Sequence, residues 1–253
     1  MYAFPVKPVT LTIHARILRR SLAVLTLVLA AAVYAADKGP AAQPPWCDSF
    51  SPDKTDLFNT GKNPFFFLWP GYRLYLQHGK DSRVISVLME TRMVDGVKTR
   101  VVEQRETQDG RLAAVSRNYF VISGTTGDVY YFGADVDIYQ DGKVTGHEGS
   151  WLAGINGAKF GLMMPGRPAV GDRYYHEVAP GVALNRAEVV GSGEDFTTSD
   201  RTFERCVRIR ESSGLGTGVE ERLYAPDVGL VRDGEFVLMR IGCPLCDGVS
   251  AAP

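Results

Sequence analysis

The sequence predicts an all-β protein built on a single antiparallel, strongly curved sheet, a half-barrel or open barrel with meander-like connections. Four Asp-Gly pairs, at 95–96, 109–110, 141–142 and 233–234, separate runs rich in Val, Ile, Tyr, Phe and Thr. Asp-Gly suits a two-residue hairpin loop because both positions tolerate a positive φ. Several of these runs reach about 11 residues, whereas strands are typically about 5–6 residues long. Long strands joined by short turns must coil, which favours a curled sheet over a flat sandwich.

The N-terminal residues 1–35 have the pattern of a secretory signal peptide. Basic residues precede the apolar stretch 21–32, and Val33-Tyr34-Ala35 supplies the small residues of a cleavage site. The apolar stretch is shorter than the roughly 20 residues that a membrane span needs. We therefore expect cleavage and export to the periplasm or beyond, with no integral membrane association of the mature protein.

The charge balance indicates which partners to expect. Residues 1–35 hold four of the 28 Lys and Arg residues and none of the 29 Asp and Glu residues, so the remainder carries a net charge of −5. Nucleic-acid binding requires a clustered basic face, so we expect no nucleic-acid partner. The length that remains suits one large all-β domain.

The mature chain divides into an extended arm (36–62), the β domain (63–242) and a tail (243–253). The β domain opens with an aromatic segment bounded by prolines, 63–70, which cannot be a central strand and is expected to pack at the edge of the core. The expected strands that follow are 72–77, 84–94, 97–107, 112–122 and 129–139, a short partner near Val144, and then 173–178, 187–190, 206–211, 220–224 and 235–241.

Three segments stand out from this alternation of strands and turns. Residues 179–184 and 225–230 repeat an Ala-Pro-x-Val-x-Leu pattern, in which Pro followed by Gly or Asp makes a rigid turn. Residues 146–171 contain seven glycines together with large apolar side chains. A loop of this length in a compact domain is usually functional or disordered, and the apolar residues argue against disorder. We expect a lid or mouth loop.

Four cysteines lie beyond residue 35: Cys47, Cys206, Cys243 and Cys246. In an oxidising compartment an even number favours disulfides, and three pairings are open. Cys243 and Cys246 have the spacing of a redox motif but lie in the tail rather than at the start of a helix, so a structural disulfide is favoured. An unbroken strand from Phe203 would turn Cys206 away from the core, and only a bulge would bury it as a free thiol.

Acidic residues near the third Asp-Gly pair form a candidate cation site, made of Asp135, Asp137, Asp141, His147 and Glu148. Asp135 and Asp137 share one face of a strand because the side-chain period is two. From Asp141 the spacing agrees with the second half of a calcium loop, although the flanking segments are strands and the upstream acids are two residues too far away. The alternatives are an ordinary turn with solvated acids, and a transition metal bound through His147.

Several motifs together resemble a family of exported bacterial proteins that has no assigned activity. They are Tyr-Tyr-Phe-Gly-Ala-Asp-Val-Asp at 130–137, His-Glu-Gly-Ser-Trp at 147–151, Met-Pro at 164–165, Thr-Phe before Cys206, and Tyr-Ala-Pro-Asp-Val-Gly-Leu-Val at 224–231. The resemblance covers roughly residues 63–240 and implies no biochemistry. The layout is also similar to the half-barrels of periplasmic lipoprotein carriers, and a shared fold does not carry function with it.

No motif of a known hydrolase or metalloprotease is present, so we do not expect an enzyme. The leading hypothesis is a non-catalytic exported binding protein for a lipid-like or other elongated apolar ligand. Ligand pockets are mostly apolar with a few placed polar groups, and the residues expected to line this one are Trp69, Trp151, Phe160, Met163 and Met164. The alternatives are a calcium-binding envelope protein, the one case in which we expect a cofactor, and a structural or interaction module without a ligand.

Overall fold

The computed structural model of the chain describes residues 44–242. The expected signal peptide, the start of the expected arm, and Cys243 and Cys246 lie outside the described residues. The described part is all-β, as predicted, with 18 strands, and its one helix is the short 3-10 helix η1 (Lys54–Asp56). Within residues 44–242 no helix has the length and apolar character needed to cross a membrane.

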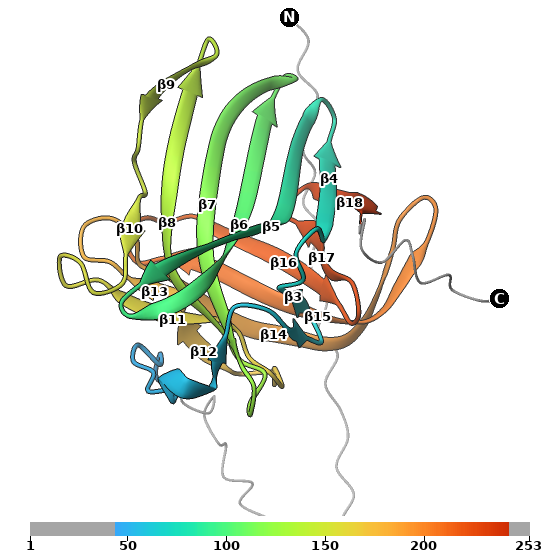
Figure 1. Cartoon of the computed structure of the whole chain (residues 1–253). Coiled ribbons are helices and arrows are strands. Elements are labelled where there is room, and N and C mark those ends of the chain that lie inside the picture. Colours follow the sequence, from blue (N-terminus) through green and yellow to red (C-terminus); the bar gives the residue numbers. More distant parts are fainter. Residues whose placement is uncertain (1–43, 243–253) are drawn as a thin grey trace, which may run out of the picture. The chain divides into compact units, whose positions relative to one another are not determined.

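One large antiparallel sheet contains most of the strands (Figure 1). Along its main path the order is β12-β14-β15-β16-β17-β18-β4-β5-β6-β7-β8-β11-β13, so strands that are neighbours in sequence are mostly neighbours in space. The strands of this path are β4 (Arg73–His78), β5 (Asp81–Val94), β6 (Val97–Gln108), β7 (Arg111–Ser123), β8 (Val129–Gln140), β11 (Lys159–Met164), β12 (Arg173–Tyr175), β13 (Glu177–Val178), β14 (Asn185–Thr197), β15 (Thr202–Ser213), β16 (Val219–Ala225), β17 (Gly229–Asp233) and β18 (Phe236–Gly242).

Five short strands lie off this path. Strand β1 (Leu57–Phe58) pairs with β7, while β9 (Lys143–Gly146) and β10 (Trp151–Leu152) pair with β8. Strands β2 (Lys62–Asn63) and β3 (Phe66–Phe67) form a separate two-stranded sheet. The described part of the expected arm is therefore attached to the main sheet, because β1 pairs with the C-terminal end of β7.

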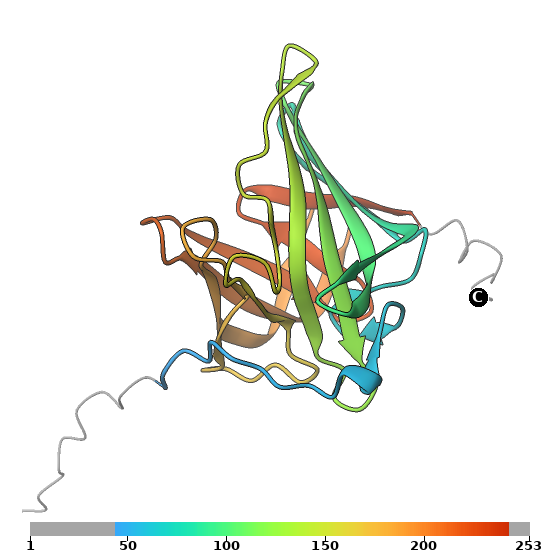
Figure 2. The same cartoon turned by 60° about the vertical axis from the view of Figure 1, so that its left-hand side comes forward.

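The main sheet curls until its two ends almost meet. Figure 1 shows β5 to β8 crossing the flatter strands β14 to β17, and Figure 2 shows the long strands β7 and β8 rising away from them at one end. The end strands β12 and β13 are separated in sequence only by His176, and β12 pairs with β14 while β13 pairs with β11. The sheet is thus nearly closed and barrel-like, with one unsealed seam at His176.

Three of the four Asp-Gly pairs form the predicted turns. Asp95, Asp109 and Asp141 have φ values of 48°, 49° and 50°. The glycine after each also has a positive φ, as a type I′ turn requires. The fourth loop is shifted by one residue, because Asp233 ends β17 and the two loop residues are Gly234 and Glu235. Gly234 has a φ of 58°, which fits a turn that needs glycine only at its first central position. Asp233 is therefore free to point into the interior.

The segment 146–171 is not a lid. It contains β10 and β11, which both pair with β8, so it forms part of the wall of the sheet. A Cβ at Gly161 would lie 2.3 Å from the Tyr175 carbonyl oxygen and 2.4 Å from that of His176. Glycine at this position therefore allows β11 to approach the backbone at the seam. Other glycines of the segment, such as Gly154 and Gly157, occupy turns with a positive φ, so its glycines serve both turns and close backbone packing.

The aromatic segment 63–70 packs at the edge of the core, as expected. Phe67 and Leu68 are buried, and Phe67 stacks on Tyr72 with ring centroids 5.0 Å apart. The buried Asn63 side chain anchors the segment, since its Nδ2 donates 2.9 Å hydrogen bonds to the carbonyl oxygens of Gly127 and Pro165.

The two Ala-Pro-x-Val-x-Leu segments, 179–184 and 225–230, form the same turn, as predicted. Gly181 and Asp227, which occupy the same position in the two Ala-Pro-x-Val-x-Leu segments, have φ values of 73° and 62°. In each segment the valine N–H donates to the carbonyl of the alanine three residues earlier, at 3.0 Å in the first and 3.3 Å in the second.

Cys206 is fully buried because β15 is bulged. The residue before it, Arg205, has a φ of 55°, and the pairing of β14 with β15 shifts on both sides of the Glu194–Cys206 pair. The bulge that burial of the Cys206 thiol requires is therefore present. Cys47 is exposed, and no disulfide joins the two cysteines of the described chain.

Candidate functional site

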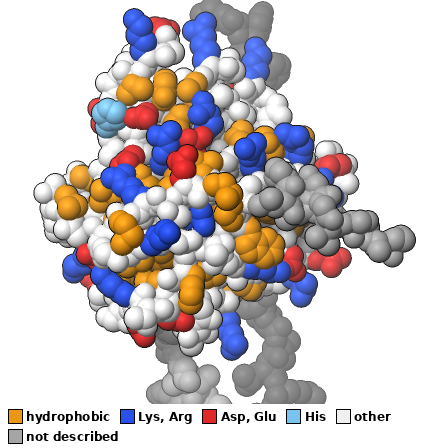
Figure 3. Space-filling view, in the orientation of Figure 1, with side chains coloured by type: hydrophobic (Ala, Val, Ile, Leu, Met, Phe, Trp, Pro, Cys, Tyr) orange, Lys and Arg blue, Asp and Glu red, His pale blue; other side chains and the backbone are white. Residues whose placement is uncertain are grey.

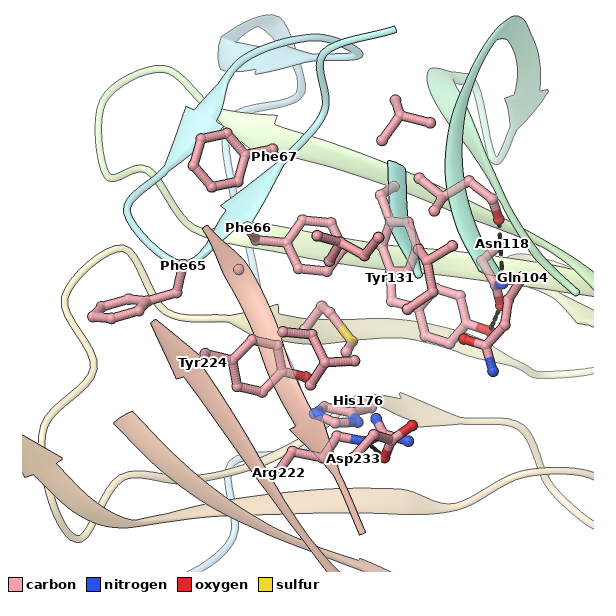
Figure 4. Close-up of a pocket in the computed structure, with 18 of the residues that line it drawn as sticks. Phe65, Phe66, Phe67, Gln104, Asn118, Tyr131, His176, Arg222, Tyr224 and Asp233 are labelled. Atoms are coloured by element: carbon pink, nitrogen blue, oxygen red, sulfur yellow. Dashed lines mark hydrogen bonds and ion pairs between the residues drawn. The ribbon is translucent and has the colours of Figure 1, made fainter. Parts of the chain in front are cut away.

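The inner face of the curved sheet encloses a cavity of about 260 Å³ (Figure 4). One end of it is apolar, lined by Phe66, Leu74, Val87, Val102, Phe120 and Leu230. The other end is charged, lined by His176, Glu177, Glu211, Arg222 and Asp233, and Gln104, Ser116 and Asn118 add uncharged polar groups from β6 and β7. The cavity therefore has an apolar end and a charged end.

The apolar end follows from strand pairing. Val87 on β5 lies opposite Val102 on β6, and directly paired residues of an antiparallel sheet share a face. The ring of Phe120 on β7 meets Phe66 edge-on, with centroids 5.1 Å apart, and stacks on Tyr131 at 4.8 Å. These contacts make the aromatic segment part of the wall at the apolar end.

Arg222 on β16 is the centre of the charged end. Its Nη1 lies 2.8 Å and 2.7 Å from the two carboxylate oxygens of Glu211 on β15, and its Nε donates to Asp233 on β17 at 2.6 Å. Burial lowers the pKa of Arg222, but the two carboxylates outweigh this and hold its pKa well above the ordinary value. Arg222 is thus permanently charged.

Asp233 has a second cationic partner, since Arg83 on β5 also forms an ion pair with it. Burial raises the pKa of Asp233, but the two guanidinium groups, Arg222 first and then Arg83, bring it below the ordinary value. This pair of contacts joins β5 to β16 and β17 across the inside of the sheet. A buried charge is tolerated when it is paired and hydrogen-bonded in this way.

Glu177 on β13 differs from the other two acids. It is 1% exposed, and its Oε1 accepts a hydrogen bond from the Asn185 backbone N–H at 2.9 Å. No Lys, Arg or His among residues 44–242 forms an ion pair with it. Burial is the main reason that its pKa is raised to about 7.

His176 is the neighbour of Glu177 at the seam and is also buried. Its Nε2 lies 3.9 Å from Glu211 and has no hydrogen-bond partner within residues 44–242. Burial lowers the pKa of the imidazole, with Glu211 opposing and Arg222 adding to the shift. The ring is therefore neutral at pH 7 and offers one unpaired nitrogen beside the cavity.

The five predicted ligand-binding residues do not gather in one site. Met163 lines the cavity, but Met164 is fully buried in the core and Phe160 stacks on Phe132 at 4.5 Å. Trp151 packs edge-on against Tyr131, with centroids 5.2 Å apart, and does not line this cavity. Trp69 is 40% exposed. Apolar character identified core residues in every case except Trp69, but it did not distinguish the cavity wall from the packed interior.

The five predicted metal ligands are also divided. Asp135 forms an ion pair with Arg92 and accepts a hydrogen bond from the Tyr119 hydroxyl at 2.6 Å. Asp137 meets His147 at 2.9 Å. Across residues 44–242 no three side chains of His, Cys, Asp or Glu come together in a way that could hold a metal ion. Asp141 occupies its hairpin turn and Glu148 lies beside Gly146, so calcium binding stays a prediction without a converging ligand set.

The charged residues of the cavity were missed from the sequence because they come from separate strands. Glu177, Glu211 and Arg222 lie on β13, β15 and β16, and the last two have exposed charged neighbours in their strands, such as Arg210 and Glu220. Asp233 was assigned to a turn. The strand register could have revealed one of these pairs. If the two loop residues are taken as Gly234 and Glu235, Arg222 lies directly opposite Asp233.

The fold and the site together define a class: a barrel-like all-β protein with a small, two-ended cavity inside its sheet. Comparison with family models, with curated proteins and with solved structures found no match. The resemblance to exported bacterial proteins therefore remains a prediction, and the site is interpreted from its own chemistry.

Proposed function

We propose that this is a non-catalytic, exported binding protein that holds a small lipid-like molecule, apolar with one polar group, inside its curved sheet. The observation that carries the proposal is the division of the cavity into an apolar and a charged end. Binding sites for small molecules combine apolar walls with a few convergent polar groups. A packed structural module would fill this space with its own side chains.

The size of the cavity limits the ligand. An apolar cavity of about 150 Å³ in another protein holds one benzene molecule. By proportion, the cavity of about 260 Å³ found here accommodates roughly ten non-hydrogen atoms. The ligand is then closer in size to a medium-chain amphiphile than to a full phospholipid.

One face of the outer surface carries charged side chains of both signs. On the face shown in Figure 3, acidic and basic side chains are interspersed, with hydrophobic side chains scattered between them. The predicted signal peptide and the family resemblance both support export, which belongs to the same proposal.

Calorimetric titration with three eight-carbon compounds, 1-octanol, octanoate and octylamine, tests the proposal. We expect at least one to bind with a Kd below about 100 μM, which roughly ten atoms can supply. Val102→Phe, which fills the apolar end, should weaken that binding by about tenfold. Met89→Phe is the matched control, because Met89 is 74% exposed on the same sheet.

Native mass spectrometry of protein purified from its own host should show a retained small molecule that Val102→Phe lacks. If none of the three compounds binds and no retained molecule is detected, the proposed function is wrong. Thermal unfolding of each variant shows whether the fold is intact.

A further inference from the structure

The charged end of the cavity contains more negative than positive charge. Its three carboxylates, on Glu177, Glu211 and Asp233, face two guanidinium groups, on Arg222 and Arg83. Both guanidinium groups are occupied by Glu211 and Asp233. Glu177 is therefore the buried acid that has no cationic partner among residues 44–242.

The remaining polar groups near Glu177 do not neutralise it. The Asn185 backbone N–H supplies one hydrogen bond to Oε1, and the Tyr131 hydroxyl donates instead to Asn118 Oδ1 at 2.8 Å. His176 is neutral, and its Nε2 has no partner in the described chain. Figure 4 shows His176 beside Arg222 and Asp233, with the rings of Tyr224 and Phe66 on the side away from the charges.

We propose that the natural ligand is a small apolar amine, bound as its ammonium ion with the Glu177 carboxylate as its counter-ion. This inference rests on the proposed function and narrows the ligand class. The ammonium group lies at the charged end, where the Glu177 carboxylate accepts its N–H bonds. The hydrocarbon part lies against the apolar wall that includes Phe66, Val87 and Val102.

An amine fits this cavity better than an acid or an alcohol for an electrostatic reason. A carboxylate ligand would bring a second unpaired negative charge next to Glu177, and both cations nearby are already occupied. An alcohol would make a hydrogen bond but leave the buried charge uncompensated. A buried charge is costly unless it is paired, and an ammonium ion is the one of these three groups that pairs it.

The pH dependence of binding follows from the surroundings of Glu177. The groups that face it are Glu211, Arg222, Tyr131 and His176, with Asp233 behind Arg222. Burial and Glu211 favour the protonated acid, while the Asn185 hydrogen bond and Arg222 oppose them. Alkylamines stay protonated between pH 6 and pH 8, so amine affinity should increase over this range as Glu177 ionises.

The test compares octylamine, 1-octanol and octanoate by calorimetry on the full mature protein at pH 6 and pH 8. At pH 8 we expect octylamine to bind at least tenfold more tightly than octanol, and octanoate to bind most weakly. Glu177→Gln should remove the tenfold advantage of the amine and its pH dependence, while octanol binding changes less than threefold. Glu220→Gln, at an exposed position, should change neither.

The outcomes separate the two claims. If octanol or octanoate binds as tightly as octylamine, or if Glu177→Gln binds octylamine as the wild type does, the amine inference is wrong and the binding function stands. If none of the three compounds binds the folded wild-type protein, both claims are wrong. The glutamine variant keeps the oxygen that accepts the Asn185 hydrogen bond, and unfolding curves confirm that it folds.

Discussion

At the scale of single residues, the interior charges fall into two kinds. Glu211 and Asp233 both pair with Arg222, which donates direct hydrogen bonds to their carboxylates. Glu177 is equally enclosed but relies on one backbone N–H. A buried acid without a cation reduces stability when it ionises. A buried acid without a cationic partner, next to a cavity, is typical of a functional site rather than of a core.

Replacing Glu177 with glutamine should change how stability depends on pH. Its folded-state pKa of about 7 lies above the ordinary 4.5, so between these values the folded protein keeps a proton that the unfolded chain has lost. The stability that this proton contributes is complete below about pH 4.5 and is lost as the pH rises through 7. Relative to the variant, the wild type should lose about 1.4 kcal/mol per pH unit in this window.

Urea unfolding of both proteins in steps from pH 4.5 to pH 7.5 measures this difference. His176 contributes a slope of the opposite sign, because its pKa is lowered, but it is present in both proteins and cancels. The unfolding free energy of Glu220→Gln should change with pH in the same way as that of the wild type. Parallel curves for Glu177→Gln would show that the carboxyl group does not take up a proton on folding.

At the scale of elements, turn chemistry and close backbone contacts determine the sheet. The residue pairs at 95–96, 109–110 and 141–142 could be assigned from sequence because a two-residue loop depends only on local φ preferences. The position of β11 could not be assigned, because glycines that allow close packing and glycines that form a loop look alike in sequence. For Cys206, the sequence predicted only that a buried thiol would require a bulge. Whether the bulge forms depends on the pairing with the neighbouring strand.

Gly161→Ala should destabilise the protein by about 1–3 kcal/mol. The added Cβ would meet the Tyr175 and His176 carbonyl oxygens, which are backbone atoms and can move only if the strands at the seam move. Gly216→Ala is the matched control, because a Cβ there has nothing within 4 Å. Urea unfolding measures both. Equal stability of the two variants would show that β11 does not lie against the seam.

At the scale of the whole described domain, closure of the sheet depends on a segment from outside the predicted β domain. Cys47 makes a parallel bridge to Tyr174, with its N–H donating to the Arg173 carbonyl at 3.0 Å and its carbonyl accepting from the Tyr175 N–H at 2.9 Å. The ring of Trp46 lies under the guanidinium groups of Arg173 and Arg186, at 4.2 Å and 4.8 Å. The described end of the arm thus covers the β12 side of the seam.

Trp46→Ala should loosen this cover and destabilise the protein by about 1–2 kcal/mol, the strength of a partly buried cation–π contact. The amide of Tyr175 should then exchange with solvent at least tenfold faster, since the Cys47 carbonyl is its acceptor. Hydrogen exchange of the 173–178 segment measures this. Trp69→Ala, which removes a tryptophan elsewhere, should leave that exchange unchanged, and unaltered exchange in Trp46→Ala would exclude a sealing role.

The sequence by itself determined the all-β class, the antiparallel order of β4 to β8, three hairpin turns and the repeated proline turn, because each depends on residues close together in the chain. The tertiary structure alone decided where charge gathers and which apolar residues line a cavity. Glu177, Glu211, Arg222 and Asp233 become neighbours only when the sheet curls until β13 faces β16 and β17. That curvature results from the twist of many long strands together, which no short stretch of sequence encodes.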